Sequence, residues 1–263
     1  VGFQHLLSIC QEFWNTAVMR KDWCSSTTVP LYKGKGDPLN CASYRGIRLL
    51  EHGLKIIEKV IHRRLLGLSK IGNYQYDFMA GKFTIDAIFI MPQLQEKFCA
   101  KKLELYHIFV DLEKAFDRVS RKAIVWSLRR QFVPERLIEL IMAMYHHTAT
   151  AVCTPCGVTS EFNINAGVHQ GSILSPLLFI TVMEEVTKSI RSNDYCELMY
   201  ADDIVLTEPS EEQVARRFVT WKNQLTDHGL KINIDKTKIL VTGEPNEPVS
   251  RGRWPCSVCK SGV

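Results

Sequence analysis

Tyr200-Ala201-Asp202-Asp203 is the stretch that decides the fold of this 263-residue chain. Apolar residues flank it, Leu198-Met199 before and Ile204-Val205-Leu206 after, so the sequence predicts two short strands joined by a tight turn. Two adjacent carboxylates backed by apolar strands repel each other and lose water, so they bind either protons or a cation. Mg²⁺ prefers oxygen ligands and keeps sites for substrate phosphates. The stretch therefore indicates a magnesium site at a hairpin tip or, alternatively, a solvated Asp-Asp turn.

A second carboxylate follows a buried strand. The continuous apolar and aromatic run over residues 105–110 predicts a central strand covered on both faces, and Asp111 follows it directly. Such an Asp either caps a helix or takes part in catalysis. If this strand lies beside the hairpin, Asp111, Asp202 and Asp203 converge on two metal ions about 3.5–4 Å apart, as in enzymes of phosphoryl transfer. The three acids then favour a polymerase or a nuclease.

Basic residues upstream favour the polymerase. The loop 33–38, Lys-Gly-Lys-Gly-Asp-Pro, combines two lysines with two glycines and suits the binding of phosphates through charge and backbone N–H groups. Residues 44–50 follow as a strand that carries Arg45. A lysine loop beside an arginine strand is a better triphosphate site than either alone.

Composition is that of an ordinary globular protein with a mildly basic balance. There are 33 basic and 28 acidic residues, a net charge of +5, which is compatible with a nucleic-acid partner. No apolar run has the length of a membrane span, so no membrane partner is expected. Nine cysteines without framework spacing indicate reduced thiols in an intracellular compartment. The chain begins at Val1 within a predicted helix, and we expect a piece of a longer protein.

Seven blocks of sequence occur together in one order. They are Tyr32-Lys33-Gly34-Lys35-Gly36-Asp37, Tyr44-Arg45-Gly46-Ile47, residues 75–84, residues 109–117, Gly167-Val168-His169-Gln170-Gly171-Ser172-Ile173-Leu174-Ser175-Pro176, the Tyr-Ala-Asp-Asp stretch, and residues 229–233 with Lys236-Thr237-Lys238. In this order, from about residue 23 to 241, they resemble the reverse transcriptase of non-LTR (LINE-type) retrotransposons.

The resemblance implies an α+β fold with the fingers and palm of a right-hand polymerase, an antiparallel palm sheet backed by helices, and a missing or incomplete thumb. We expect fingers and N-terminal helices in residues 1–104, the palm in 105–242, and a loose tail in 243–263. Within these, residues 85–101 predict a helix that Pro92 kinks or restarts, and residues 230–241 predict two short strands.

The same resemblance implies residue roles. Asp111 and Asp202 correspond to the metal ligands, with the Leu112 carbonyl as a backbone ligand and Asp203 as the supporting acid. The implied cofactor is Mg²⁺, as two ions, with Mn²⁺ as a substitute. Nucleotide contacts fall on Lys33, Arg45, Phe116, Gln170, Gly171 and Lys236. Contacts to primer or template fall on Gln75, Gly81, Lys82, Tyr200 and Ala201.

The implied function is an RNA-directed DNA polymerase that binds an RNA template, a DNA primer and dNTPs, in the nucleus or cytoplasm. Two alternatives stay open. An RNA-dependent RNA polymerase shares the metal chemistry, but the bulky Phe116 occupies the place of a ribose 2′-OH. A decayed retroelement copy would retain only nucleic-acid binding, and the altered block Tyr76-Asp77-Phe78 with Lys82 in place of arginine keeps it possible. The sequence does not indicate an oligomeric state.

Cys256 and Cys259 have the spacing of half a zinc site, similar to the opening of a Cys/His-rich segment that follows some of these polymerases. A closed zinc site needs four ligands, so we expect no zinc in this chain.

Overall fold

The computed structural model describes residues 2–146, 148–192 and 196–242, and the chain forms two compact units. Unit 1 comprises Val1–Lys70 and Val119–Thr181, and unit 2 comprises Ile71–Arg118 and Val182–Val263. Each unit is built from two stretches of the chain. Residues 71–104 join unit 2 because the backbone at Tyr74 and Tyr76 bonds to Met199, with N···O distances of 2.8 and 2.9 Å.

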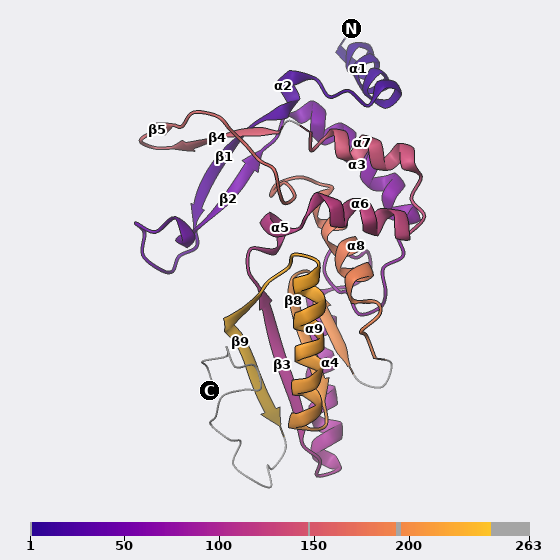
Figure 1. Ribbon diagram of the computed structural model, residues 1–263, viewed down its shortest axis with the longest axis vertical. Coiled ribbons are helices and arrows are strands. Elements are labelled where there is room, and N and C mark those ends of the chain that lie inside the picture. The colour runs from indigo at the N-terminus through magenta and orange to yellow at the C-terminus, as the bar shows by residue number, and fades with distance from the viewer. Residues whose placement is uncertain (1, 147, 193–195, 243–263) are drawn as a thin grey trace. The chain divides into compact units, whose positions relative to one another are not determined.

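Unit 1 combines a sheet with helices (Figure 1). Its strands are β1 (Ser25–Tyr32), β2 (Tyr44–Leu49), β4 (Ala149–Thr154), β5 (Gly157–Val158) and β6 (Phe162–Asn163). Its helices are α1 (Gly2–Thr16), α2 (Lys21–Cys24), η1 (Cys41–Ser43), α3 (His52–Leu68), α6 (Arg121–Arg130), α7 (Glu135–Ala143) and the first part of α8 (Ser175–Thr187). The sheet order is β2-β1-β4-β5, with β6 also on β4; β1 pairs antiparallel with β2 and parallel with β4.

The helices of unit 1 follow the predicted apolar stripes. Helix α3 buries Leu54, Ile57, Ile61 and Leu65, which recur at helical spacing on one face. The opposite face carries its lysines and arginines, so the core of unit 1 forms on one side of this helix only.

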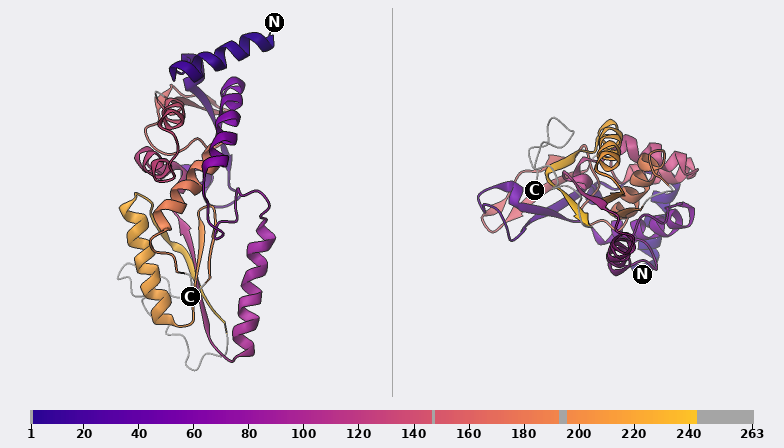
Figure 2. Two further views of the ribbon diagram at one scale, coloured as in Figure 1. Left: turned by 90° about the vertical axis from the view of Figure 1, so that its right-hand side faces the viewer. Right: turned by 90° about the horizontal axis from the view of Figure 1, so that it is seen from below.

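Unit 2 is a four-stranded antiparallel sheet with a helix on either side. Its elements are α4 (Thr84–Ala100), β3 (Leu105–Leu112), α5 (Ala115–Arg118), β7 (Glu197–Tyr200), β8 (Asp203–Glu208), α9 (Glu211–Asp227) and β9 (Ile232–Thr242). The strand order is β7-β8-β3-β9. Figure 2 shows α9 along one face of this sheet and α4 on the opposite side. The predicted α+β class, the predicted strand at 105–110 and the predicted hairpin are confirmed.

Two predicted details need comment. Of the two outcomes predicted at Pro92, a kink or a new segment, the new segment is wrong, because helix α4 continues through the proline. A helix can run past one proline when it gives up one backbone hydrogen bond. Residues 232–242 form one strand, β9, but its register on β3 shifts between Phe109 and Asp111. The break expected near Lys236 is therefore an irregularity within one strand.

Some predictions concern parts that the structure does not describe. Cys256, Cys259 and the tail from residue 243 lie outside the described residues. Within the described part, no helix has both the length and the apolar character to cross a membrane.

Because His107 of β3 is buried, we expect the free energy of unfolding of unit 2 to depend on pH. Its side chain is fully buried, its Nδ1 lies 3.0 Å from Thr207 Oγ1, and burial lowers its pKa to about 4. In the unfolded chain this imidazole takes up a proton near pH 6.5, whereas in the folded chain it stays neutral until about pH 4. Its contribution to the free energy of unfolding is therefore fully present above pH 6.5 and is lost as the pH falls. We expect this histidine alone to cost about 2 kcal/mol of unfolding free energy between pH 7 and 5.

Urea unfolding at both pH values, followed for unit 2 by amide exchange, measures this loss. His107→Asn keeps a polar atom near Thr207 and should remove about 2 kcal/mol of the pH dependence. His5→Asn, on the exposed helix α1, is the matched control and should leave the dependence unchanged. An equal pH dependence in His107→Asn and the wild type would contradict the assignment.

Candidate active site

The Asp-Asp turn lies at the end of the β7–β8 hairpin, beside the end of β3. Tyr200 pairs with Asp203 across the hairpin, and Ala201 adopts a positive φ of 53° in the turn. Val110 of β3 pairs with Ile204 of β8. Asp111 is the next residue of β3 after Val110, and its negative charge acts on both Asp202 and Asp203. The three predicted carboxylates therefore meet at one edge of the unit 2 sheet.

The electrostatics of this edge are those of a crowded acidic cluster. Burial raises the pKa of Asp202, and the negative charges of Asp203, Asp111 and Asp77 raise it further, against a backbone N–H that lowers it. Burial also raises the pKa of Asp203; Asp111 and Asp77 add to the rise, and Lys236 opposes it. A cation bound at this edge would relieve the repulsion among the acids.

Lys236 forms an ion pair with a carboxylate of this cluster. Its Nζ lies 3.1 Å from Asp111 Oδ2. The register shift in β9 lets it reach this position, because residues 234–237 leave the ladder between the pairs Phe109–Lys238 and Asp111–Asn233. Among the described residues, no three His, Cys, Asp or Glu side chains are grouped as metal ligands. The donor atoms suit a hard divalent cation, but their arrangement is not a ready-made site.

The side chain of Gln75 is hydrogen-bonded to the backbone of the Asp-Asp turn. Its side chain is 1% exposed, and its Oε1 accepts hydrogen bonds from the backbone N–H groups of Tyr76, Asp77 and Ala201, each at 3.0 Å. Ala201 is the residue with positive φ, so this amide holds the least favourable backbone position of the turn. Gln75 was predicted to contact primer or template; in the structure its oxygen contacts the turn.

The segment around Gln75 contributes two further contacts. Tyr200 OH accepts a hydrogen bond from Thr84 Oγ1 at 2.8 Å, and it is also hydrogen-bonded to the Asp77 carboxylate. The Lys82 ammonium donates to the carbonyl oxygens of Asn73 and Gln75, both at 2.9 Å, and lies 5.0 Å from the centre of the Tyr76 ring. Lys82 thus closes its own loop instead of pointing its charge outward.

The other predicted residues of unit 2 lie on nearby elements. Phe116 is half-buried in the short helix α5, five positions after Asp111. Leu112 is buried at the end of β3 and pairs with Ile232. Gly81 has a φ of +78°, a conformation that favours glycine, in the loop that Lys82 closes.

In unit 1, the loop of Lys33 and the strand of Arg45 form one hairpin, β1–β2. Arg45 pairs with Leu31, two residues before Lys33, so both basic side chains belong to the same face of the hairpin. Lys33 Nζ donates to the Ala42 carbonyl at 2.8 Å, and both residues are exposed. The structure therefore brings these two predicted phosphate contacts together.

Gln170 and Gly171 lie against the same strand β2. The Arg48 N–H donates to the Gln170 carbonyl at 2.7 Å. Gly171 has a φ of +112°, and a Cβ on it would lie 2.4 Å from the Arg48 carbonyl oxygen. Only glycine fits this approach. Lys33, Arg45, Gln170 and Gly171 are thus grouped around β2 within unit 1.

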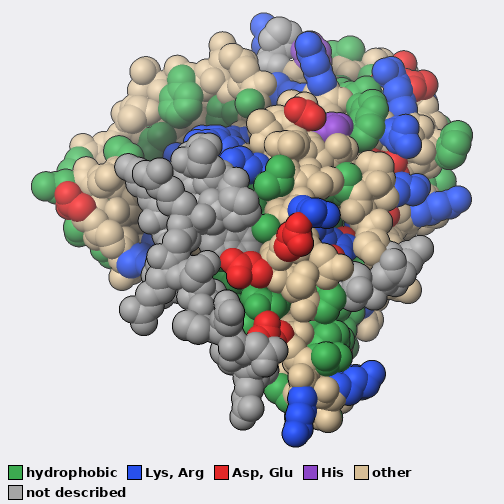
Figure 3. All heavy atoms as spheres, turned by 60° about the horizontal axis from the view of Figure 1, so that its bottom comes forward, with side chains coloured by type: hydrophobic (Ala, Val, Ile, Leu, Met, Phe, Trp, Pro, Cys, Tyr) green, Lys and Arg blue, Asp and Glu red, His purple; other side chains and the backbone are tan. Residues whose placement is uncertain are grey.

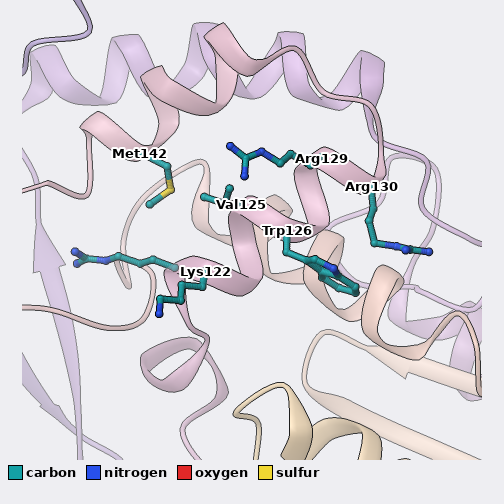
Figure 4. A pocket seen from close by; sticks show the side chains of 7 residues that line it. Lys122, Val125, Trp126, Arg129, Arg130 and Met142 are labelled. Carbon is teal, nitrogen blue, oxygen red and sulfur yellow. The ribbon is translucent and has the colours of Figure 1, made fainter.

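A separate groove of about 550 Å³ in unit 1 mixes basic and apolar side chains (Figure 4). Arg121 donates to the carbonyl oxygens of Tyr145 and Ile164, at 2.7 and 2.6 Å, and Arg129 pairs with Glu135 at 2.7 Å. The Arg130 guanidinium lies 5.4 Å from the Trp126 ring. Since its arginines bond within unit 1, the groove is explained by packing.

Sequence reasoning missed two features of unit 2. Asp77 is a fourth carboxylate of the acidic cluster, noticed only as a departure from the family pattern. Arg217 of α9 forms buried ion pairs with Glu197 at the start of β7 and Glu208 at the end of β8. A basic residue on the apolar face of a helix was the available signal, because a charge placed there needs a buried partner.

Comparison with known proteins finds relatives of similar sequence. The chain is 25% identical over 81% of its length to the RNA-directed DNA polymerase from mobile element jockey of Drosophila melanogaster. It is 24% identical over 78% of its length to the Pol polyprotein from the type-1 retrotransposable element R2 of Nasonia vitripennis. It spans only 24% and 20% of these two relatives.

Among solved structures, telomerase from Candida tropicalis in complex with a fragment of telomeric RNA aligns with 91% of this chain. The TM-score is 0.65 at 14% identity, and the match covers 45% of the telomerase chain. This likeness shows a shared fold. The family model described as reverse transcriptase (RNA-dependent DNA polymerase) matches residues 33–254. With that match over most of its length, the chain belongs to the reverse transcriptase family.

Proposed function

We propose that this chain is the catalytic part of an RNA-directed DNA polymerase of a non-LTR retrotransposon, which adds dNTPs to a DNA 3′-OH on an RNA template. The observation that carries the proposal is the meeting of Asp111, Asp202 and Asp203 at one edge of the unit 2 sheet. Family membership and relatives named as RNA-directed DNA polymerases support it.

In this proposal unit 2 is the palm. Asp111 and Asp202, with the Leu112 carbonyl, would hold two Mg²⁺ ions, and Asp203 would support them; Mn²⁺ would substitute. Bound Mg²⁺ supplies a lowered pKa for the attacking hydroxyl and neutralisation of the phosphates. Gln75 keeps the Asp-Asp turn in place, Tyr200 and Ala201 lie near the primer end, and the Phe116 ring excludes a ribose 2′-OH. Lys236, which pairs with Asp111, is available to the leaving pyrophosphate.

Unit 1 carries four of the residues predicted to contact the nucleotide. Lys33 and Arg45 share a face of the β1–β2 hairpin and would bind the triphosphate as two cations. Gln170 and Gly171 would lie beneath the incoming base and its template partner. Figure 3 shows both basic and acidic side chains on the face that it draws. We assign phosphate binding to Lys33 and Arg45 because they belong to one hairpin.

A second candidate function is nucleic-acid binding without catalysis. One observation favours it: Lys236 holds the Asp111 carboxylate, and the described residues contain no preformed metal group. Mg²⁺ would then have to compete with the ammonium for Asp111. A protein of this kind would bind template–primer and extend nothing.

Primer extension on an RNA template tests the proposal and both alternatives. We expect Mg²⁺-dependent extension with dNTPs, loss of extension with EDTA, and little extension with NTPs.

Phe116→Val should shorten the side chain at the ribose and raise NTP use relative to dNTP use by about tenfold or more, a change of roughly 1.4 kcal/mol in selectivity. Exclusive NTP use by the wild type would instead assign an RNA polymerase, and binding without extension would assign the second candidate.

A further inference from the structure

The loop that carries Gln170 and Gly171 is held within unit 1 by contacts on two sides. On one side, strand β2 holds it through the Arg48 N–H bond to the Gln170 carbonyl and the close approach of Gly171 to the Arg48 carbonyl. On the other side, the loop meets the side chain of Glu58, a residue of helix α3 that is 2% exposed. The first contact uses the backbone only, so the second is the one that a side chain controls.

Both oxygens of Glu58 are used by this one loop. Ser172 Oγ donates to Oε1 at 2.5 Å, and the Ile173 N–H donates to Oε2 at 3.2 Å. Burial raises the pKa of Glu58, while these two hydrogen bonds and the charge of Lys55 lower it. A carboxylate at such depth costs free energy that hydrogen bonds must offset. An apolar residue would fill the same space without that cost but would leave the loop unbonded.

Ser172 links Glu58 to the start of helix α8 through hydrogen bonds. Its Oγ accepts hydrogen bonds from the N–H groups of Leu174 and Ser175, at 3.1 and 3.3 Å. These are the donors that a helix N-terminus leaves without an internal partner. Glu58 orients the Ser172 hydroxyl, and that hydroxyl sets where the loop ends and α8 begins.

We infer that Glu58 is a positioning residue for the nucleotide-binding loop: it acts through Ser172 and Ile173 to hold Gln170 and Gly171 in register with β2. This inference rests on the proposed function, since the loop matters only if it lies beneath the incoming nucleotide. Glu58 itself contacts no substrate in this scheme.

Steady-state kinetics with two single variants, their double variant and a control variant test the inference. Glu58→Gln keeps size but presents an amide NH₂ where a carboxylate oxygen accepted, and Ser172→Ala removes the hydroxyl. We expect each to raise the KM for dNTP about tenfold with kcat changed by less than about twofold. The double variant should be worse than either single one by less than the sum of their effects, because both disturb the shared Glu58–Ser172 hydrogen bond. Ser127→Ala, another buried hydroxyl of unit 1 that donates to the Ala123 carbonyl, is the matched control and should leave KM unchanged.

Amide hydrogen exchange of residues 170–174 gives a readout without activity. Glu58→Gln and Ser172→Ala should each speed exchange there by about tenfold or more, and Ser127→Ala should not. If the first two variants only lower the melting temperature, as Ser127→Ala does, with no selective change in KM or loop exchange, the inference is wrong. If the wild type extends no primer, the proposed function fails, while exchange still decides whether Glu58 anchors the loop; Ser172→Ala serves if Glu58→Gln does not fold.

Discussion

Asp202→Asn abolishes primer extension and leaves template–primer binding close to that of the wild type. The substitution keeps the size of the side chain and removes one of the negative charges that would hold the divalent ions. Metal-ion stabilisation of the transition state amounts to several kcal/mol, so we expect at least a thousandfold loss of rate, about 4 kcal/mol. Single-turnover extension in Mg²⁺ measures it.

The same variant carries an internal check on folding. Burial and the nearby acids raise the pKa of Asp202, so its charged form is unfavourable in the folded chain without metal. Loss of the charge should therefore maintain or raise the melting temperature in EDTA near pH 8, where the carboxylate is otherwise ionised. Asp227→Asn, at the exposed end of α9, controls for a neutral Asp-to-Asn change. Wild-type extension by Asp202→Asn would show that the metal ligands are assigned wrongly.

The sequence predicted the parts of this site that depend on local pattern. A continuous apolar run predicts a strand, so the sequence could place Asp111 at the end of one strand and Asp202 with Asp203 at a hairpin tip. That this strand lies beside the hairpin was only a condition of the sequence argument, and the pairing of β3 with β8 meets it. Lys33 and Arg45, in contrast, share one hairpin. Their separation in sequence is small enough that local turns determine their positions.

Contacts made by side chains over long separations were not predictable in this way. Gln75 lies 126 residues from Ala201, and nothing in its own segment indicates that its amide turns inward. Lys82 looks like an exposed cation in sequence, yet its ammonium bonds backbone carbonyls of its own loop. Glu58 sits on a helix among lysines and arginines, where a solvated position is the expectation. Each buried polar group reflects a partner that only tertiary packing supplies.

Arg217→Met destabilises unit 2 by about 3–5 kcal/mol, because it leaves two buried carboxylates without their cation. Glu197 and Glu208 are 2% and 5% exposed, and both pair with this guanidinium. Urea unfolding followed by amide exchange in unit 2 measures the loss. Arg216→Met is the matched control, since Arg216 is exposed and pairs with Glu212 one helical turn away. It should change stability by about 0.5 kcal/mol or less.

The pH dependence of this loss identifies its cause. Burial raises the pKa of Glu197, and the charge of Arg217 opposes the rise. Without Arg217 the folded pKa rises further above the unfolded one, so the glutamate contributes stability below its unfolded pKa that disappears as pH rises through the folded pKa. The deficit of Arg217→Met should therefore be larger at pH 8 than at pH 5. A deficit independent of pH would point to lost packing of the long side chain instead.

These ion pairs also bear on activity, because Glu197 begins β7 and Glu208 ends β8, the two strands that carry the Asp-Asp turn. Helix α9 thus ties both strands of the hairpin at the ends away from the turn, while Gln75 holds the turn itself. At a low temperature at which unit 2 of Arg217→Met is folded, we expect this variant to extend primers more weakly than the wild type. Replacing all three charges, as Arg217→Met with Glu197→Leu and Glu208→Leu, removes the unpaired carboxylates and should recover most of the stability. Recovery of stability without recovery of extension would show that the ion pairs orient the hairpin in addition to stabilising it.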